Sequence, residues 1–378
     1  MASQELLLRV AKLKFEDGSN NSEIAEILLK DGTLETESTA QRKVGELVEE
    51  AGQWLLDRHK LLASMEMDDS LEHNLAKELC SKFSLLDARV VPGGEIHSPL
   101  DYVALLKKYA RAAAHYFDAY ASVAEDQGKQ LHVSVSGGQP ILDMVSSLTD
   151  RKRTNVFYYA TGLIGRGSRP QAPHVGSEAN ATVAWARSGR LPNHLYYATV
   201  RPYEIAPDDL HDTDKRKRHD TCRAMLLEQM HDLANSEYVK EVLKEINGRI
   251  NMAFAGLGIP HASGVDADYG VAHIERLTMT GLLKPLGVDS GLLAAEGAVG
   301  DISYTLFDKD GKSREDWQFF ITAGYPDALD FYQTMVETRK PVIVIGGARK
   351  EAAILPALKA RLLNVLITDA VTANKLLA

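Results

Sequence analysis

From about residue 65 onward, short apolar segments alternate with segments of helical spacing. The apolar segments are rich in β-branched and aromatic residues, as buried strands are, and they read DARVVPG, LHVSVSGG, NVFYYATGLIG, HLYYATV, INMAFAGLG, VIVIGG and NVLITD. Strands that alternate with helices are typical of a mostly parallel, doubly wound sheet covered by helices on both faces. We therefore expect an α/β domain over residues 63–378.

The first 62 residues have a different pattern, which predicts an all-α module. Amphipathic segments over 6–15, 23–29 and 37–56 are separated by Gly18 and by the sequence Lys-Asp-Gly at 30–32. Three short helices joined by tight turns are typical of a helix-turn-helix. A helical dimerisation arm has the same pattern, so these residues alone leave both interpretations open.

Charge and cysteine content narrow the classes of protein. The net charge of -9 argues against a large basic domain, although a small DNA-reading module needs only a local basic face. Cys80 and Cys222 form neither a disulfide framework nor a zinc site, which indicates a reducing, cytoplasmic environment. We expect no signal peptide and no membrane span, because no run of 18 apolar residues occurs.

Several of the expected strands end in glycine. These glycines are Gly137, Gly138, Gly162, Gly256, Gly258, Gly346 and Gly347. Ligands of doubly wound folds bind beyond the carboxyl ends of the strands. Glycines there allow backbone N–H groups to approach an anion at the start of the next helix. The pattern predicts a phosphate-bearing ligand, and each single turn is equally compatible with a tight connection that binds nothing.

Other motifs indicate neither a nucleophile nor a metal. GLIGRG has the wrong glycine spacing for a dinucleotide fingerprint, and no Walker A lysine, G-x-S-x-G elbow or metal-ligand histidine spacing occurs. We interpret DKDG, at 308–311, as a hairpin turn rather than a calcium loop. We interpret the mixed-charge run HDTDKRKRHD, at 211–220, as a surface insertion.

The C-terminal third resembles a known family. GLGIP, GAVGDISYTLFDKDG, VIVIGGARKEAAILPAL and NVLITDAVTANKLL occur in the order and spacing of the SorC/DeoR-type sugar-binding transcriptional regulators. The resemblance implies an N-terminal helix-turn-helix DNA-binding module, expected over 1–62. It also implies a sugar-binding effector and oligomerisation domain, expected over 63–378, whose fold resembles sugar-phosphate isomerases and deaminases.

The resemblance assigns roles to particular side chains. It implies that Asp301, in GAVGD, binds hydroxyls of a sugar effector, and that Lys350, after the Gly-Gly turn, meets the effector. A carboxylate accepts hydrogen bonds from hydroxyls and a lysine supplies charge to a phosphate. Asp369 is expected to cap the last helix. Further effector contacts are expected from the strand-end turns, at Gly137, Gly138, Gln139, Gly162, Leu163, Gly165, Arg166, Gly346 and Gly347.

The N-terminal match is shorter. SEIAEIL fits the family pattern, but the third segment carries Glu46 where the family usually has arginine, and acidic residues outnumber basic ones over 1–60. Phosphate contacts dominate DNA affinity, so this balance disfavours tight binding. DNA contacts are expected from the start of the third segment, at Thr39, Gln41, Arg42 and Lys43.

These observations favour a ligand-responsive transcriptional regulator over two alternatives. The regulator would bind operator DNA and a sugar or sugar phosphate, form a homodimer or homotetramer, need no cofactor, and not be an enzyme. One alternative is a sugar-phosphate isomerase or deaminase on the same scaffold, with Asp301 as general base. The other is a regulator that has lost operator binding and acts through protein contacts.

Overall fold

The computed structural model describes most of the chain, and each structural statement below refers to these residues. They are 4–11, 13–14, 21–34, 40–48, 50–51, 71–93, 96–161, 176–188, 195–196, 214–260, 283, 287–347 and 349–378. The chain forms two compact units, 1–73 and 74–378, which are described separately. The boundary expected at 62/63 falls within 52–70, outside the described residues.

The N-terminal unit is helical, with its own small core. It contains α1 (Gln4–Ala11), α2 (Asn21–Lys30) and a further helical segment over 40–48. Gly32, with φ of 77°, turns the chain after α2, and the Leu34 N–H then donates to the Leu28 carbonyl (3.0 Å). The core consists of apolar side chains from all three helical segments, namely Leu7, Val10, Ile24, Ala25, Leu28, Leu34, Ala40, Val44 and Ala51.

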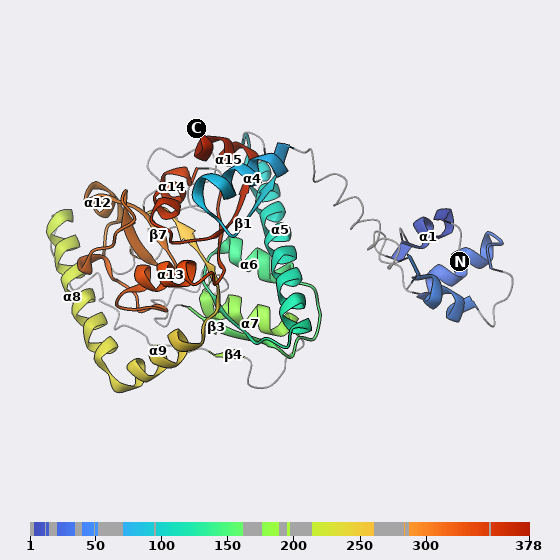
Figure 1. The fold of residues 1–378 in the computed structure, drawn as a ribbon, viewed down its shortest axis with the longest axis horizontal. Helices are drawn as coiled ribbons and strands as arrows, with labels where there is room; N and C mark the ends of the chain where they lie inside the picture. The colour runs from blue at the N-terminus through green and yellow to red at the C-terminus, as the bar shows by residue number, and fades with distance from the viewer. Residues whose placement is uncertain are drawn as a thin grey trace. The chain divides into compact units, whose positions relative to one another are not determined.

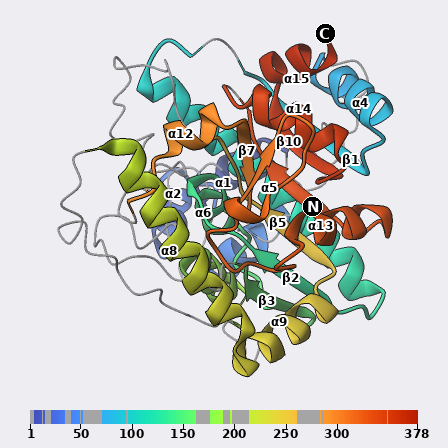
Figure 2. The same cartoon turned by 90° about the vertical axis from the view of Figure 1, so that its left-hand side faces the viewer.

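The larger unit is built on a seven-stranded sheet in which every pair of neighbouring strands is parallel. Its strands are β1 (Asp87–Val91), β2 (Leu131–Val135), β3 (Val156–Ala160), β4 (Leu195–Tyr196), β5 (Met252–Ala255), β9 (Val342–Ile345) and β10 (Val365–Asp369). Their order across the sheet is β1-β10-β9-β5-β2-β3-β4. Figure 2 shows β10, β5, β2 and β3 following one another across it.

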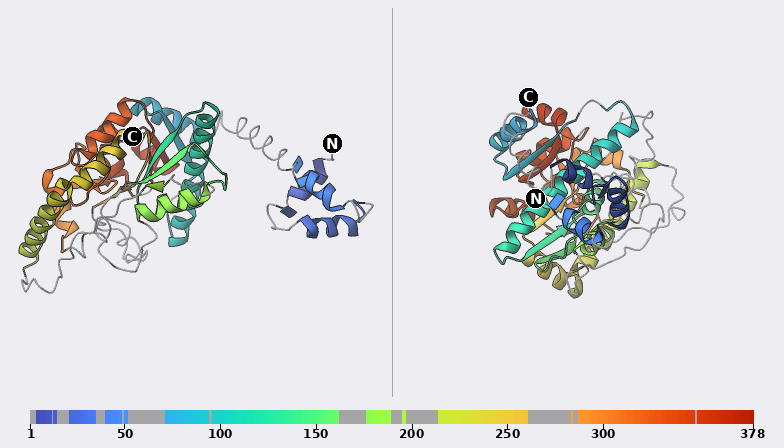
Figure 3. Two further views of the ribbon diagram at one scale, coloured as in Figure 1. Left: turned by 90° about the horizontal axis from the view of Figure 1, so that it is seen from below. Right: turned by 90° about the vertical axis from the view of Figure 1, so that its right-hand side faces the viewer.

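Helices cover both faces of this sheet. One face packs against α5 (Pro99–Asp126), α6 (Gln139–Ser146) and α7 (Ser177–Arg187). The other packs against α4 (Leu71–Phe83), α8 (Lys215–Asn235), α9 (Glu237–Arg249), α12 (Ser290–Ala295), α13 (Ala328–Glu337), α14 (Glu351–Lys359) and α15 (Ala370–Leu377). Figures 1 and 3 show α5 and α7 on the side of the strands opposite α8 and α9.

Alternation within the strands divides the apolar side chains between the two cores. In β10, Val365 and Ile367 belong to the core under α5, whereas Leu366 belongs to the core under α14. A strand buried on both faces has no polar side, which explains its continuous apolar sequence. The expected doubly wound, mostly parallel α/β domain behind an all-α module is therefore confirmed.

A second, three-stranded antiparallel sheet lies beside the carboxyl end of β5. It consists of β6 (Leu257–Gly258), β7 (Ala298–Ile302) and β8 (Thr305–Asp308), in the order β6-β7-β8. The β7–β8 hairpin turns at Ser303 and Tyr304, whose φ angles are 46° and 72°.

Two details of the sequence interpretation were wrong. DKDG is a tight turn, closed by a hydrogen bond from the Asp308 N–H to the Lys312 carbonyl (2.9 Å). It does not join two strands, because it follows the β7–β8 hairpin and no strand comes directly after it in the described chain. The basic part of the 211–220 run is not an insertion but the exposed start of α8, capped by Asp214. No helix among the described residues is long and apolar enough to cross a membrane.

Candidate functional site

Three of the glycine turns lie together at the centre of the large sheet. Because β9, β5 and β2 are adjacent and parallel, their carboxyl ends share one edge. A Cβ atom on Gly256, after β5, would lie only 2.9 Å from the Gly137 carbonyl oxygen, after β2. A Cβ on Gly346, after β9, would contact Leu257 of β6 at 3.8 Å. The absence of a side chain at Gly256 therefore allows the backbone segments after β5 and β2 to approach closely.

Asp301 is buried beside these turns, in β7. It pairs in register with Gly258 of β6, and any Cβ on Gly258 would overlap the Asp301 carboxylate. The residue is only 7% exposed, and its Oδ2 accepts one hydrogen bond from the Tyr304 N–H (3.3 Å). Burial raises the pKa of Asp301 from 3.8 to about 6, although the Lys350 charge and the Tyr304 N–H both oppose the rise.

Lys350 contacts the same short strand. It occupies the N-cap position of α14, and its Nζ donates to the Leu257 carbonyl (2.6 Å). Burial lowers the pKa of Lys350, and the neighbouring Asp301 charge counteracts this effect. The two residues that the resemblance singled out, 49 positions apart in sequence, are therefore brought together around β6.

Gly347 leaves space for a contact between two other side chains. A Cβ at this position would overlap the Tyr109 hydroxyl and would lie 2.5 Å from Asp369 Oδ2. The Asp369 carboxylate accepts from the Tyr109 hydroxyl (2.5 Å) and from the Thr372 N–H (2.8 Å), so it caps α15 as expected. Gly347 thus has a packing role, and the Tyr109–Asp369 contact was missed because it joins residues 260 positions apart.

The turn after β2 is held by a side chain that the sequence interpretation also missed. Gly138, with φ of 107°, is the N-cap of α6, and the Gln139 side chain donates to Asp143 (2.6 Å) within that helix. From α7, the Asn180 amide donates to the carbonyls of Ser136 (3.0 Å) and Gly138 (3.3 Å). The remaining predicted contacts, Gly162, Leu163, Gly165 and Arg166, lie outside the described residues.

In the N-terminal unit, three predicted DNA contacts are exposed on the helical segment over 40–48. The Gln41 amide donates to Ser22 Oγ at the start of α2 (3.0 Å). Arg42 projects away from the core, whereas Lys43 lines a surface hollow of about 240 Å³. Successive helical residues point about 100° apart, so the three side chains point in different directions from the helix. Thr39 lies outside the described residues.

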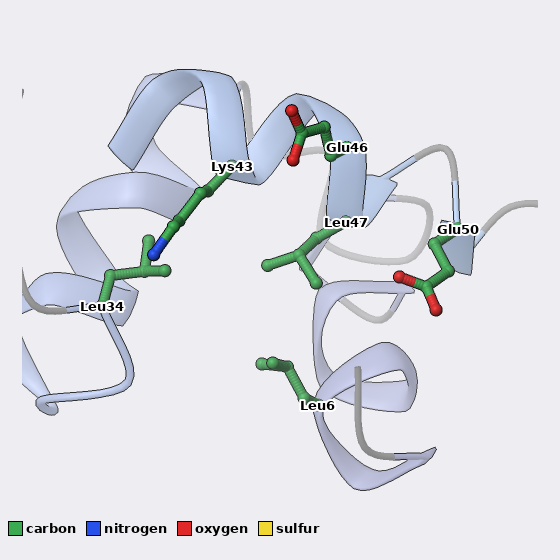
Figure 4. A pocket seen from close by; sticks show the side chains of 6 residues that line it. All are labelled: Leu6, Leu34, Lys43, Glu46, Leu47 and Glu50. Atoms are coloured by element: carbon green, nitrogen blue, oxygen red, sulfur yellow. The ribbon is translucent and has the colours of Figure 1, made fainter. Parts of the chain in front are cut away.

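The hollow has an apolar floor and charged walls. It is lined by residues of α1, of the turn after α2 and of the 40–51 region, namely Leu6, Leu34, Lys43, Glu46, Leu47 and Glu50 (Figure 4). Glu46 and Glu50 place carboxylates one and two turns beyond Lys43. These acids reduce the positive potential that a DNA-facing helix normally provides.

Part of the chain matches a known protein family. Residues 226–378 match the protein family described as "Putative sugar-binding domain", a match that includes Asp301, Lys350 and both glycines of the last turn. No curated protein sequence matches the chain significantly.

Solved structures with the same fold are transcriptional regulators. The full-length sorbitol operon regulator SorC from Klebsiella pneumoniae is 16% identical, covers 100% of both chains and has a TM-score of 0.52. A DeoR family transcriptional regulator from Listeria monocytogenes is 18% identical over 81% of this chain and 100% of its own, with a TM-score of 0.51. A transcriptional regulator from Streptococcus pneumoniae is 18% identical over 81% and 96%, with a TM-score of 0.54.

The family match and the shared fold confirm the resemblance drawn from the motifs. Residues 226–378 match the family model of a putative sugar-binding domain, on a chain that has the fold of the SorC and DeoR regulators.

Proposed function

We propose that this protein is a transcriptional regulator whose larger unit binds a sugar or sugar-phosphate effector and whose N-terminal unit binds operator DNA. The observation that supports it most is the convergence of Asp301 and Lys350 on β6, inside the matched sugar-binding domain. We further propose that the protein acts as a homodimer or homotetramer, since paired half-sites would compensate for a weak single DNA contact. It is a regulator rather than an enzyme.

The chemistry of the pair suits a polyhydroxy ligand. Asp301 is buried with one hydrogen bond to the Tyr304 N–H, so much of its acceptor capacity is unused. Sugar hydroxyls would replace the water that burial has removed from this carboxylate. Lys350 adds a cation within reach of the same strand, where it complements a phosphate or a ring hydroxyl.

An enzymatic reaction on the same scaffold is the competing proposal, and one observation favours it. A carboxylate whose pKa lies at about 6 is suited to act as a general base near neutral pH. An isomerase or deaminase would convert a sugar phosphate over time, whereas a regulator would bind it unchanged. Product analysis after prolonged incubation with the ligand therefore separates the two functions.

Thermal unfolding of the full chain against sugar phosphates and the matching free sugars tests the effector proposal. A ligand present at 100 times its Kd adds about 2.7 kcal/mol of stability, which raises the midpoint of a chain of this length by roughly 3–5 °C. Lys350→Met should abolish this rise. Lys340→Met is the matched control. Lys340 also donates to a backbone carbonyl, that of Ile250 (3.3 Å), but it lies just before the amino end of β9, whereas the candidate site lies at the carboxyl end. If no sugar or sugar phosphate raises the midpoint, the effector proposal is wrong.

A further inference from the structure

The turn that joins β2 to α6 is fixed from outside by one buried side chain. Asn180, on α7, is fully buried, and its Nδ2 donates to the carbonyls of Ser136 and Gly138, on either side of Gly137. The orientation of the amide is set by these contacts, because the flipped orientation would place Oδ1 against two carbonyl oxygens. Asn180 therefore dictates the direction of two peptide groups in the turn.

The direction of those carbonyls determines where the turn's N–H groups point. In a planar trans peptide the C=O and the following N–H point in opposite directions. The N–H groups of Gly137 and Gln139 therefore point away from Asn180. Within the described chain neither N–H donates a hydrogen bond, and the Thr161 carbonyl, beyond β3, accepts from the Ala323 N–H instead (3.1 Å). Two backbone donors at the start of α6 are thus available.

The buried amide of Asn180 also lowers the stability of the fold, so packing alone does not explain why asparagine occupies this position. Asn180 Oδ1 is buried and has no hydrogen-bond partner among the described residues. A buried polar atom without a partner is destabilising, whereas leucine would fill a similar volume without leaving such an atom. The benefit of asparagine here is the pair of bonds to the turn. The turn itself contacts Gly256, directly before the strand that meets Asp301 and Lys350.

We propose that Asn180 is a positioning residue of the effector site, which aims the N–H groups of Gly137 and Gln139 at an anionic group of the effector. This inference rests on the proposed function and makes it more specific: the effector carries a phosphate or carboxylate, held by the β2–α6 turn while Asp301 binds hydroxyls. Free N–H groups at a helix N-terminus suit such a group.

The test uses full-length protein labelled with ¹⁵N-glycine and titrated with inorganic phosphate, with chloride replaced to keep the ionic strength constant. The amide signal of Gly137 reports on the turn directly. Asn180→Leu removes the donor and keeps the number and branching of the side-chain heavy atoms, and Asn180→Ser is a smaller side chain that serves if the leucine variant does not fold. Asn155→Leu is the matched control, since Asn155 is also buried, donates from Nδ2 to a carbonyl, that of Lys129 (3.1 Å), and has an unpartnered Oδ1.

Phosphate should shift the Gly137 signal in the wild type and in Asn155→Leu with the same affinity. The Asn180 variants should bind phosphate about tenfold more weakly, as expected when two charge-assisted hydrogen bonds are misaligned. Their response to any free sugar that binds the wild type should remain within about twofold, because Asp301 is untouched. The inference is overturned if the wild-type Gly137 signal does not respond, or if the Asn180 variants match Asn155→Leu. Stabilisation by a free sugar in either case would leave the proposed function intact.

Discussion

Replacing Asp301 by asparagine should make the protein more stable and insensitive to its effector. Asparagine keeps the shape of the side chain and an acceptor for the Tyr304 N–H, but it removes a buried charge. The pKa of Asp301 is raised by burial to about 6 from an ordinary value of 3.8. A difference of roughly two pKa units corresponds to about 3 kcal/mol, and the attraction of Lys350 is already included in it.

The sign of this effect depends on pH. A carboxyl group whose pKa is raised by folding favours the folded state below its unfolded pKa and loses that contribution as the pH rises through its folded pKa. The wild type and Asp301→Asn should therefore have similar stability near pH 3.8, and the variant's advantage should grow up to pH 6 and remain constant above it. At pH 7.5 we expect the free energy of unfolding of the variant to be higher by about 3 kcal/mol.

Urea unfolding followed by intrinsic fluorescence at several pH values measures this difference. Asp289→Asn is the control with the opposite sign. Asp289 caps α12. Burial alone would raise the pKa of Asp289, but Lys215 and the Leu292 N–H lower it below its ordinary value. That variant should be less stable than the wild type at pH 7.5 and should approach it as the pH falls. The reasoning is refuted if Asp301→Asn is destabilised at pH 7.5, or if its difference from the wild type does not change between pH 4 and 7.

Gly258→Ala places a Cβ against the Asp301 carboxylate, so it should abolish the thermal response to the effector and lower stability by about 1–3 kcal/mol, measured by the same unfolding assays. Asp118→Asn removes the partner of Arg153, whose side chain is 3% exposed, and should cost about 3–5 kcal/mol in urea unfolding while leaving the effector's Kd unchanged. Arg42→Ala should weaken DNA binding and reduce the slope of log affinity against log salt by about one, measured by fluorescence anisotropy; an unchanged slope would exclude Arg42 as a phosphate contact.

The large sheet was predictable because its strands are buried on both faces. Segments such as VIVIGG and NVLITD have no polar side, which distinguishes them from the helices between them. The small β6-β7-β8 sheet was not predicted. Its strands are short, and β6 pairs with β7 across more than 40 residues, so local periodicity carries no information about the pairing.

The start of α8 was misinterpreted for a related reason. Its inward-facing residues include His219, Cys222 and Arg223 rather than a regular apolar stripe. Arg223 is neutralised by Glu296 (2.7 Å) and Asp316, which lie more than 70 positions away. A helix that buries charges against distant partners does not have the apolar periodicity on which sequence interpretation depends.

The candidate site was predictable in part. The motifs pointed to Asp301 and Lys350, and the glycines marked strand ends without indicating which of them are adjacent. The sequence does not indicate that Asn180 contacts a turn about 40 residues earlier, because an isolated asparagine in an alanine-rich helix resembles a surface residue. Gly347 was assigned to the ligand, whereas its immediate neighbours are Tyr109 and Asp369.

In the function proposed for this protein, effector binding and operator binding influence each other in one molecule. The most direct measurement is a linkage experiment with a DNA fragment selected from the source genome, in which the Kd for DNA is determined with and without saturating effector, and the Kd for effector with and without DNA. We expect each ligand to change the affinity for the other by the same factor, on the order of 5–150-fold. Equal DNA affinities with and without an effector that demonstrably binds at Lys350 would contradict it.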